Sequence, residues 1–172
     1  MQNSLEFIEI FVMLVLMAEV AQSIFRERPY EIEDLGDLER VEKGAGEACW
    51  DRAAIAFNAK QLNRETRVLM AEGEEDLDEL IGFYVVEFEE NHLYLCNLAI
   101  SPQWRRRGAA QFALQAIESM AAELNYPEIA LDVQENNLPA QLLYKKCGFT
   151  AVEIRRRHYE TQDGYHMTKD LV

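Results

Sequence analysis

Residues that build metal sites and disulfide frameworks are scarce in this sequence. It has three cysteines and three histidines among 172 residues, and no two cysteines form a C-x-x-C pair. An odd number of such cysteines offers no disulfide framework and is typical of a reducing compartment. The histidines, His92, His158 and His166, show no metal-ligand spacing. We therefore expect a cytoplasmic protein that binds no metal.

Positive charge is also scarce. Lysine and arginine number 17 against 31 aspartates and glutamates, which gives a formal net charge of −14 at pH 7. Because nucleic-acid binders gain much of their affinity by neutralising phosphates, this composition argues against a nucleic-acid partner. It favours the attraction of cationic partners without specifying one.

The chain begins without a long hydrophobic run. Its first apolar stretch, residues 10–18, is bracketed by Glu9 and Glu19, whereas a membrane-spanning helix needs about 20 apolar residues. The residues before this stretch include no lysine or arginine, whereas a secretory signal starts with a basic region. The sequence therefore predicts neither a membrane span nor a secretory signal.

Residues 1–29 are predicted to form an apolar helix appended to a domain of residues 30–172. Apolar residues recur at alternating spacings of three and four, as in a helical seam, and Pro29 ends the helix because the residue before a proline is pushed out of the helical region. The seam consists of Phe7, Ile10, Leu14, Met17, Ala21 and Ile24. A second apolar side indicates broad burial, either against the same domain or in a homodimer.

Residues 30–172 predict α/β layering over a mixed sheet. No repeat, low-complexity tract or Pro/Gly/Ser-rich linker divides them. Strands are expected at residues 30–35, 67–71, 80–88, 93–100, 129–133, 149–157 and 165–171. Helices are expected after an N-cap at Asp37 and at residues 50–62, 109–124 and 138–146.

Residues 104–110 read W-R-R-R-G-A-A and lie between a predicted strand and a predicted helix. One interpretation is a solvated basic turn. The other is an anion site, because the free N–H groups and the dipole of a helix start attract phosphate, glycine lets a bulky ligand approach, and arginine supplies forked donors. The pattern alone leaves both interpretations open.

Two segments resemble motifs of the GNAT N-acetyltransferase superfamily. Residues 97–110, N-L-A-I-S-P-Q-W-R-R-R-G-A-A, resemble motif A, with Arg105, Gly108 and Ala110 at its fixed positions. Residues 136–149, N-N-L-P-A-Q-L-L-Y-K-K-C-G-F, resemble motif B. The resemblance covers residues 30–170 and implies the GNAT fold, a mixed central sheet with splayed strands 4 and 5 flanked by helices.

The resemblance also implies that the chain uses acetyl-CoA as co-substrate. The basic loop would hold the pyrophosphate, the pantetheine arm would lie between the splayed strands, and an N–H of the first of these strands would stabilise the carbonyl oxygen. The implied coenzyme-binding residues are Leu98, Ala99, Ile100, Arg105, Arg106, Arg107, Gly108, Ala109, Ala110, Asn137, Tyr144 and Lys146. A helix N-cap is the alternative role of Asn137, and stabilisation of a helix C-terminus is that of Lys146.

Two residues form the implied catalytic pair. Tyr144 would be the general acid for the departing thiolate, because a phenol keeps its proton at neutral pH, and a core position is its alternative. Asp132 stands where the resembled group commonly has glutamate. It would accept the proton of the amine through water, since its side chain is one methylene shorter. Glu135 is a substitute base or a solvated loop acid.

The acceptor amine is left open by the sequence. The segments L-D-V-Q-E-N-N at 131–137 and D-G-Y-H-M at 163–167 resemble the RimI-type ribosomal-protein-alanine N-acetyltransferases, which acetylate a protein N-terminal amine. Tyr159 and Tyr165 would then bind the acceptor, although Cys49-Trp50 replaces the Pro-Trp of that group. The alternatives are a small amine (polyamine, amino acid or aminoglycoside), a lysine side chain, or a non-catalytic acyl-CoA-binding module.

Overall fold

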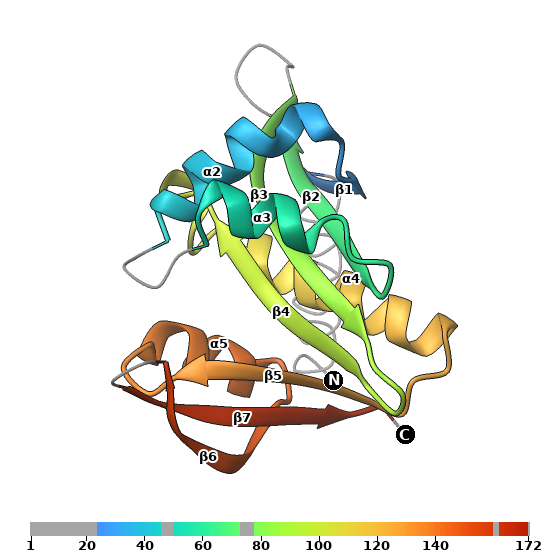
Figure 1. Cartoon of the computed structure of the whole chain (residues 1–172), viewed down its shortest axis with the longest axis vertical. Helices are drawn as coiled ribbons and strands as arrows, with labels where there is room; N and C mark the ends of the chain where they lie inside the picture. Colours follow the sequence, from blue (N-terminus) through green and yellow to red (C-terminus); the bar gives the residue numbers. More distant parts are fainter. Residues whose placement is uncertain (1–23, 46–49, 73–77, 160–161, 172) are drawn as a thin grey trace, which may run out of the picture.

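The computed structural model of the chain describes residues 24–45, 50–72, 78–159 and 162–171. Within them, strands form one mixed sheet in the order β1-β2-β3-β4-β5-β7-β6 (Figure 1), in which β4 and β5 are parallel and the other neighbours antiparallel. The strands are β1 (Phe25–Pro29), β2 (Arg64–Glu72), β3 (Asp78–Phe88), β4 (Leu93–Ile100), β5 (Glu128–Gln134), β6 (Thr150–Tyr159) and β7 (Gln162–Asp170). The helices are α2 (Leu35–Lys43), α3 (Arg52–Asn58), α4 (Ala109–Glu123) and α5 (Leu138–Lys146), with short 3-10 turns at Ile32–Asp34 and Pro102–Trp104.

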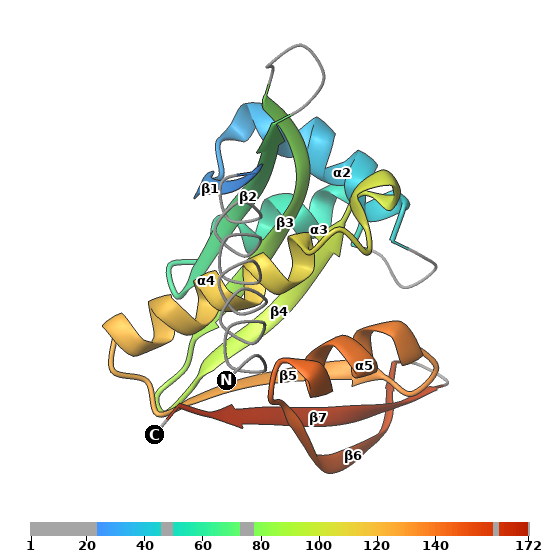
Figure 2. The same cartoon turned by 180° about the vertical axis from the view of Figure 1, so that it is seen from behind.

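Helices cover both faces of this sheet. α2 and α3 lie over β2, β3 and β4 on one face (Figure 1), and α4 and α5 lie on the other face (Figure 2). The buried apolar side chains form a cluster on each side: Leu38 and Phe83 belong to the cluster under α2 and α3, and Ile117 and Leu131 to the cluster under α4 and α5. The predicted α/β fold with a mixed sheet flanked by helices is confirmed.

The alternation of side chains along β5 decides which of its residues face the helices. Ile129, Leu131 and Val133 are buried in the cluster under α4 and α5. Because successive side chains of a strand point to opposite faces, Asp132 lies on the face that α4 and α5 do not cover. His166 of β7 is its cross-strand partner and shares that face.

β4 and β5 pair only over the first part of their length. Their ladder consists of Leu93 with Ile129, Tyr94 with Ala130, and Leu95 with Leu131, and beyond these pairs the two strands diverge (Figure 1). The divergence begins at a β-bulge, because the register of β4 against β3 skips Cys96. A bulge bends the strand that carries it and increases its twist. The predicted splaying of these two strands is therefore confirmed.

The first described residues differ from the sequence prediction. Residues 25–29 form strand β1 and pair with β2, so Pro29 ends a strand rather than a helix. The strand predicted at residues 30–35 is wrong, because a 3-10 turn stands there and leads directly into α2. α2 begins at Leu35, and Asp37 therefore lies in its first turn and not at its N-cap.

The other predicted elements are present, with shifted ends. α3 is shorter than the predicted helix at residues 50–62: Asp51 caps it by accepting the N–H of Ala54 at 2.7 Å, and it ends at Asn58. Most of the helix predicted for residues 1–29 lies outside the described residues, so the domain boundary and the homodimer contact stay predictions. Within the described residues no helix is both long and apolar enough to cross a membrane.

Candidate active site

The loop before α4 presents a row of backbone N–H groups. Arg106 and Gly108 have φ values of +60° and +97°, left-handed conformations that turn the chain into the helix. The N–H of Phe112 donates to the carbonyl of Gly108 at 2.9 Å. In the described part of the chain, the amides of residues 106–111 donate to no backbone carbonyl. Free amides at a helix start favour a bound anion.

The three arginines of this loop have different surroundings. Arg105 Nε donates to the carbonyl oxygen of Ile100 at 3.0 Å, so this side chain braces the loop against the end of β4. The guanidinium carbon of Arg107 lies 5.1 Å from the ring centroid of Trp104. Arg106 and Arg107 are exposed and supply positive charge beside the free amides.

The open end of β4 directs backbone N–H groups toward β5. The amide of Ser101, one residue past the strand, donates to the carbonyl of Ile81 in β3 at 2.8 Å. Because N–H groups of alternate residues point to the same side of a strand, the amides of Leu98 and Ile100 point the other way, into the gap that β5 leaves. The amide of Ala99 points toward β3, like that of Ser101, and its side chain is buried under α2 and α3. Leu98 and Ile100 are therefore the residues of β4 whose amides can reach a ligand in this gap.

Tyr144 lies in α5, on the covered face of the sheet. Its ring packs edge-to-face against Phe149 with centroids 5.8 Å apart, which satisfies the core interpretation of this residue. Burial, followed by the nearby Tyr159 hydroxyl and the Cys147 thiol, raises the pKa of Tyr144. The phenol therefore keeps its proton across the neutral range.

The ends of α5 carry two further residues predicted to bind the coenzyme. Asn137 is the N-cap, and its side-chain oxygen accepts the N–H of Ala140 at 3.3 Å. Its NH₂ group is the part of the side chain left to donate to a ligand. Lys146 is exposed in the last turn, where a cation stabilises the helix C-terminus. Asn137 and Lys146 thus have the structural roles that the sequence offered as alternatives to coenzyme binding.

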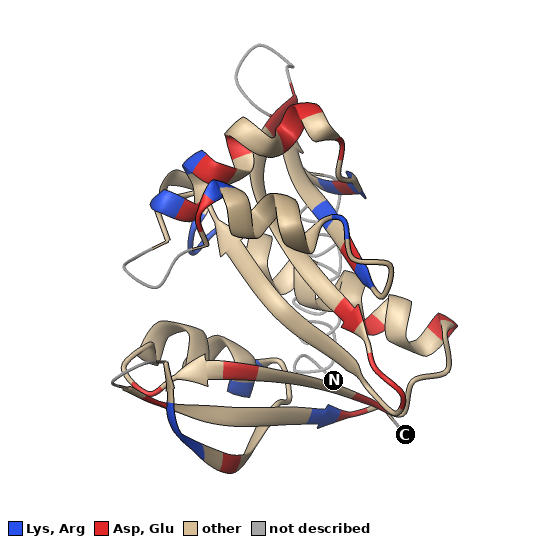
Figure 3. Ribbon diagram, in the orientation of Figure 1, with Lys and Arg blue, Asp and Glu red and all other residues tan. Residues whose placement is uncertain are grey.

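Asp132 is the centre of a polar cluster on the uncovered face. Its side chain is only 3% exposed. One carboxylate oxygen, Oδ1, lies 2.8 Å from His166 Nδ1. The other, Oδ2, accepts the hydroxyl of Tyr94 at 2.6 Å and also lies 3.3 Å from Arg155 and 3.2 Å from His158 Nε2. Basic and acidic residues thus occur together on the β5, β6 and β7 part of the sheet (Figure 3).

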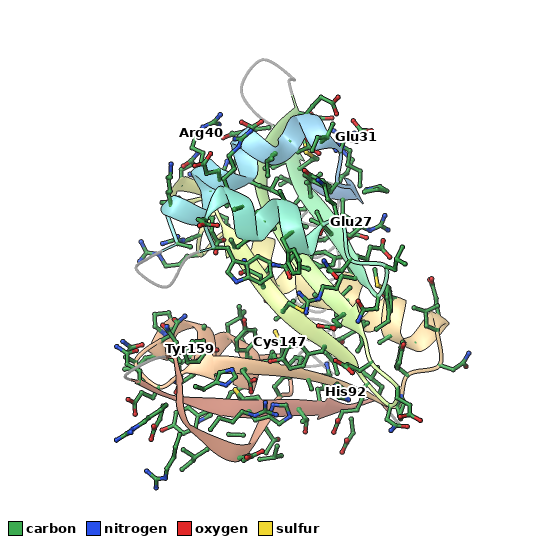
Figure 4. All side chains as sticks on the ribbon, in the orientation of Figure 1. Glu27, Glu31, Arg40, His92, Cys147 and Tyr159 are labelled. Carbon is green, nitrogen blue, oxygen red and sulfur yellow. The ribbon has the colours of Figure 1, made fainter. Side chains whose placement is uncertain are left out.

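Two tyrosine hydroxyls of the cluster are held in their neutral form. Burial, together with the bond to Asp132, raises the pKa of Tyr94. Burial, and next the charge of Asp132, raises the pKa of Tyr159 to about 12. Tyr159 lies beside the carboxyl end of β5 (Figure 4), and a Cβ added to Gly164 would stand 2.9 Å from its ring. The ring of Tyr159 therefore rests on the backbone of β7.

Tyr165 is separated from this cluster by the sheet. It pairs with Val133 and packs against the apolar cluster under α4 and α5. With Gln141 and Lys145 of α5 it lines a surface hollow. The structure therefore brings Tyr159 close to Asp132. It places Tyr165 on the opposite face, because Tyr165 is adjacent to His166 in β7 and adjacent residues of a strand alternate between faces.

The structure adds four side chains that the sequence did not single out for the site. Tyr94, Arg155, His158 and His166 surround Asp132 from β4, β6 and β7. Their contact depends on the register between strands that are far apart in sequence, so no local motif announces it. The alternation of Y-H-M in β7 gave a weak signal for His166, since adjacent residues of a strand point to opposite faces and His166 therefore lies on the face away from Tyr165.

Comparisons with known proteins agree with this geometry. The Acetyltransferase (GNAT) family model matches residues 30–149. Ribosomal protein bS18-alanine N-acetyltransferase of Haemophilus ducreyi is 27% identical over 134 residues, which cover 77% of this chain and 87% of that protein. The crystal structure of the ribosomal-protein-S18-alanine N-acetyltransferase from Escherichia coli has a TM-score of 0.74 at 20% identity, covering 86% of this chain and 94% of that one.

A second similar structure is that of a GNAT family acetyltransferase from Elizabethkingia anophelis with acetyl-CoA bound. Its TM-score is 0.68 at 16% identity, covering 86% of this chain and 98% of that one. The family match itself includes the loop before α4, the diverging part of β4 and β5, and Tyr144. With its parallel, diverging β4 and β5 and the amide-rich start of α4, the chain belongs to the acetyltransferase (GNAT) family and is an N-acetyltransferase.

Proposed function

We propose that the chain transfers the acetyl group of acetyl-CoA directly to the N-terminal α-amine of a protein. The observation that carries this proposal is the gap between β4 and β5, with free amides along β4 and at the start of α4. The α4 side of the gap offers the amides of residues 106–111, and β4 offers those of Leu98 and Ile100. A thioester laid through this gap would present its carbonyl carbon to the uncovered face.

The pyrophosphate of the coenzyme is assigned to the loop before α4. Amides from Arg106 to Ala110 would donate to the phosphate oxygens, and Arg106 and Arg107 would add charge. Arg105 would act by fixing the loop to the carbonyl of Ile100. Asn137 would donate its NH₂ to the pantetheine arm, and Lys146 would lie near a phosphate of the coenzyme.

The chemistry is assigned to groups on the two sides of the gap. Tyr144 would give its proton to the thiolate that leaves, and the amide of Leu98 would stabilise the negative charge on the carbonyl oxygen. The acceptor amine would approach from the face of Asp132 and Tyr159. Tyr165 lies on the other face, where it would contact the pantetheine arm rather than the acceptor amine.

A protein α-amine is the preferred acceptor for two reasons. An α-amine has a pKa near 8, so about a tenth of it is unprotonated at pH 7, whereas lysine, near 10.4, is unprotonated to well under a thousandth. A site whose carboxylate is buried suits an amine that needs less help in losing its proton. The names of the Haemophilus ducreyi and Escherichia coli relatives also support an N-terminal alanine as acceptor.

The test is to incubate the purified protein with acetyl-CoA and a library of peptides, polyamines, amino acids and aminoglycosides. Acetylated products are identified by mass, and the release of free thiol is measured in parallel. We expect acetylation of peptide α-amines and none of internal lysines. Acetylation of small amines alone would contradict the proposed acceptor. Binding of acetyl-CoA without thiol release for any amine would favour a non-catalytic acyl-CoA-binding module.

A further inference from the structure

The carboxylate of Asp132 is poorly accessible to a substrate amine. Tyr94 donates to Oδ2 and His166 bonds to Oδ1, while Arg155 and His158 lie 3.3 and 3.2 Å from Oδ2. The side chain is 3% exposed. An amine therefore has little access to the carboxylate, although these contacts leave one lone pair of Oδ1 unused.

His166 is bonded to Asp132 from the neighbouring strand. The two residues are cross-strand partners in the regular part of the β5–β7 ladder, and Oδ1 lies 2.8 Å from Nδ1. A neutral imidazole that donates Nδ1–H to a carboxylate has its lone pair on Nε2. The side chain is 15% exposed, so part of it remains accessible at the surface. The partner therefore fixes both the tautomer and the direction of the ring.

His158 is a less suitable base although it contacts the same carboxylate. Its Nε2 lies 3.2 Å from Oδ2, and its side chain is 38% exposed. It belongs to the stretch of β6 between Arg155 and Tyr159 where the register against β7 is broken, and Arg157 in that stretch has φ +53°. His158 is consequently the alternative base against which His166 is compared.

The cluster is not arranged as a metal site. Asp132, His158 and His166 are ligand types, yet among the described residues no group of three such side chains has the geometry to hold a metal ion. The guanidinium of Arg155 beside Oδ2 also opposes a cation there. The arrangement is that of a carboxylate orienting an imidazole, which is a general-base pair.

We propose that His166 is the general base of the acetyl transfer and that Asp132 is its positioning residue. This inference rests on the proposed acetyl transfer to an amine. The amine nitrogen forms a bond to the acetyl carbonyl carbon while the carbon–sulfur bond breaks. His166 Nε2 takes the proton of the amine, and the Tyr144 hydroxyl gives its proton to the sulfur. Solvent then returns both residues to their starting protonation.

The first experiment compares His166→Asn with His158→Gln, using whichever amine the wild-type protein acetylates. The asparagine amide can still donate to Asp132 Oδ1 but has no group in place of Nε2. We expect kcat of His166→Asn to fall about 10²- to 10³-fold, with KM for both substrates little changed and the remaining rate rising with pH. His158→Gln tests the other histidine that contacts Asp132, and its kcat should fall much less than that of His166→Asn.

The charged and titratable groups around His166 are Asp132 on β5, Glu153, its cross-strand neighbour on β6, and Tyr94, Arg155 and His158. The pH profile of His158→Gln is therefore measured alongside. The inference is overturned if His166→Asn keeps the wild-type rate and pH profile, or if both histidine variants lose activity equally.

A second measurement uses the wild-type protein and does not depend on how a variant folds. Nitrogen-15 NMR of labelled histidine reports which ring nitrogen carries the proton. We expect His166 to carry it on Nδ1 when the ring is neutral, and a proton on Nε2 would overturn the inference. If the wild-type protein acetylates no amine, the proposed function fails, and the NMR result still decides whether Asp132 orients this ring.

Discussion

At the scale of single residues, Tyr144 offers the most direct test of the chemistry. Its hydroxyl is buried, and its raised pKa keeps the proton in place well beyond neutral pH. Tyr144→Phe keeps the edge-to-face contact with Phe149 and removes only the hydroxyl. We expect kcat to fall by about 10²-fold or more while the dissociation constant for acetyl-CoA, measured by calorimetry, changes little. Equal losses in both quantities would contradict the role as general acid.

Asp34 tests a single buried ion pair that joins β1 to the start of α2. Its carboxylate accepts two hydrogen bonds from Arg28, at 2.7 and 2.8 Å, and one from the N–H of Glu31 at 2.8 Å. The bonds from Arg28 hold the pKa of Asp34 below its ordinary value. Asp34→Asn should lower the free energy of unfolding at pH 7 by about 1–2 kcal/mol.

The pH dependence of this effect follows from the lowered pKa. The contribution of Asp34 is fully present above the ordinary aspartate pKa of about 3.9 and is lost as pH falls through the lower value in the folded state. Urea unfolding curves of wild type and Asp34→Asn should therefore converge in strong acid. Asp37→Asn is the control, because its exposed pair with Arg40 should contribute less than about 1 kcal/mol. A constant difference between wild type and Asp34→Asn at every pH would contradict the ion-pair explanation.

The sequence predicted candidate site residues but not their surroundings. It singled out Asp132 and Tyr144 through their positions in motifs, and the structure places them on opposite faces of the sheet. It did not reveal that four side chains surround Asp132, because these come from β4, β6 and β7. Their meeting is decided by strand register, which no nearby residue specifies.

At the scale of elements, the turn into α4 can be tested by two glycines with the same backbone conformation. Gly108 has φ +97° and Gly148 has φ +92°, so alanine at either position should destabilise the fold by about 1–2 kcal/mol. Among the described residues, a Cβ at Gly108 would meet Phe25 alone, at 3.7 Å, so these residues can accommodate it. Gly108→Ala should also weaken acetyl-CoA binding, measured by calorimetry, whereas Gly148→Ala should not. Similar affinity in both variants would argue against a phosphate site at Gly108.

The contact between β7 and the end of β6 can be tested through Gly164. An added Cβ would stand 2.9 Å from the Tyr159 ring, so Gly164→Ala should displace Tyr159. We expect KM for the acceptor to rise several-fold with little change in the dissociation constant for acetyl-CoA. Gly36→Ala is the control, since a Cβ there meets no described residue within 4 Å and alanine favours the helix. An unchanged KM in Gly164→Ala would mean that Tyr159 does not contact the acceptor.

The elements between residues 80 and 146 were predicted well, and those before residue 36 were not. Long alternating or helical patterns specify β3, β4 and α4 locally. β1 is only a five-residue edge strand of mixed polarity, and its conformation comes from pairing with β2 rather than from its own sequence. Proline at its last residue then gave a misleading signal for the end of a helix.

At the scale of the whole molecule, charge sets an expectation for the acceptor. The net charge is −14, and acidic residues occur on most elements, with several on α2 (Figure 3). Salt screens such a field over about 8–10 Å at physiological strength. For a peptide acceptor carrying lysine or arginine after its first residue, kcat/KM should fall as salt rises. A matched neutral peptide should show little change, and equal salt effects on the two would contradict steering by net charge.

The three ladder pairs between β4 and β5 have a mechanical consequence. Past them, the half of the sheet with β1 to β4 and the half with β5 to β7 exchange no ladder hydrogen bonds, so the narrow end acts as the pivot of an open wedge. A ligand that accepts hydrogen bonds from one half and packs against the other takes the place of the absent ladder hydrogen bonds. Bound acetyl-CoA would then stabilise the relative position of the two halves, in addition to the apolar cluster under α4 and α5 that already joins them.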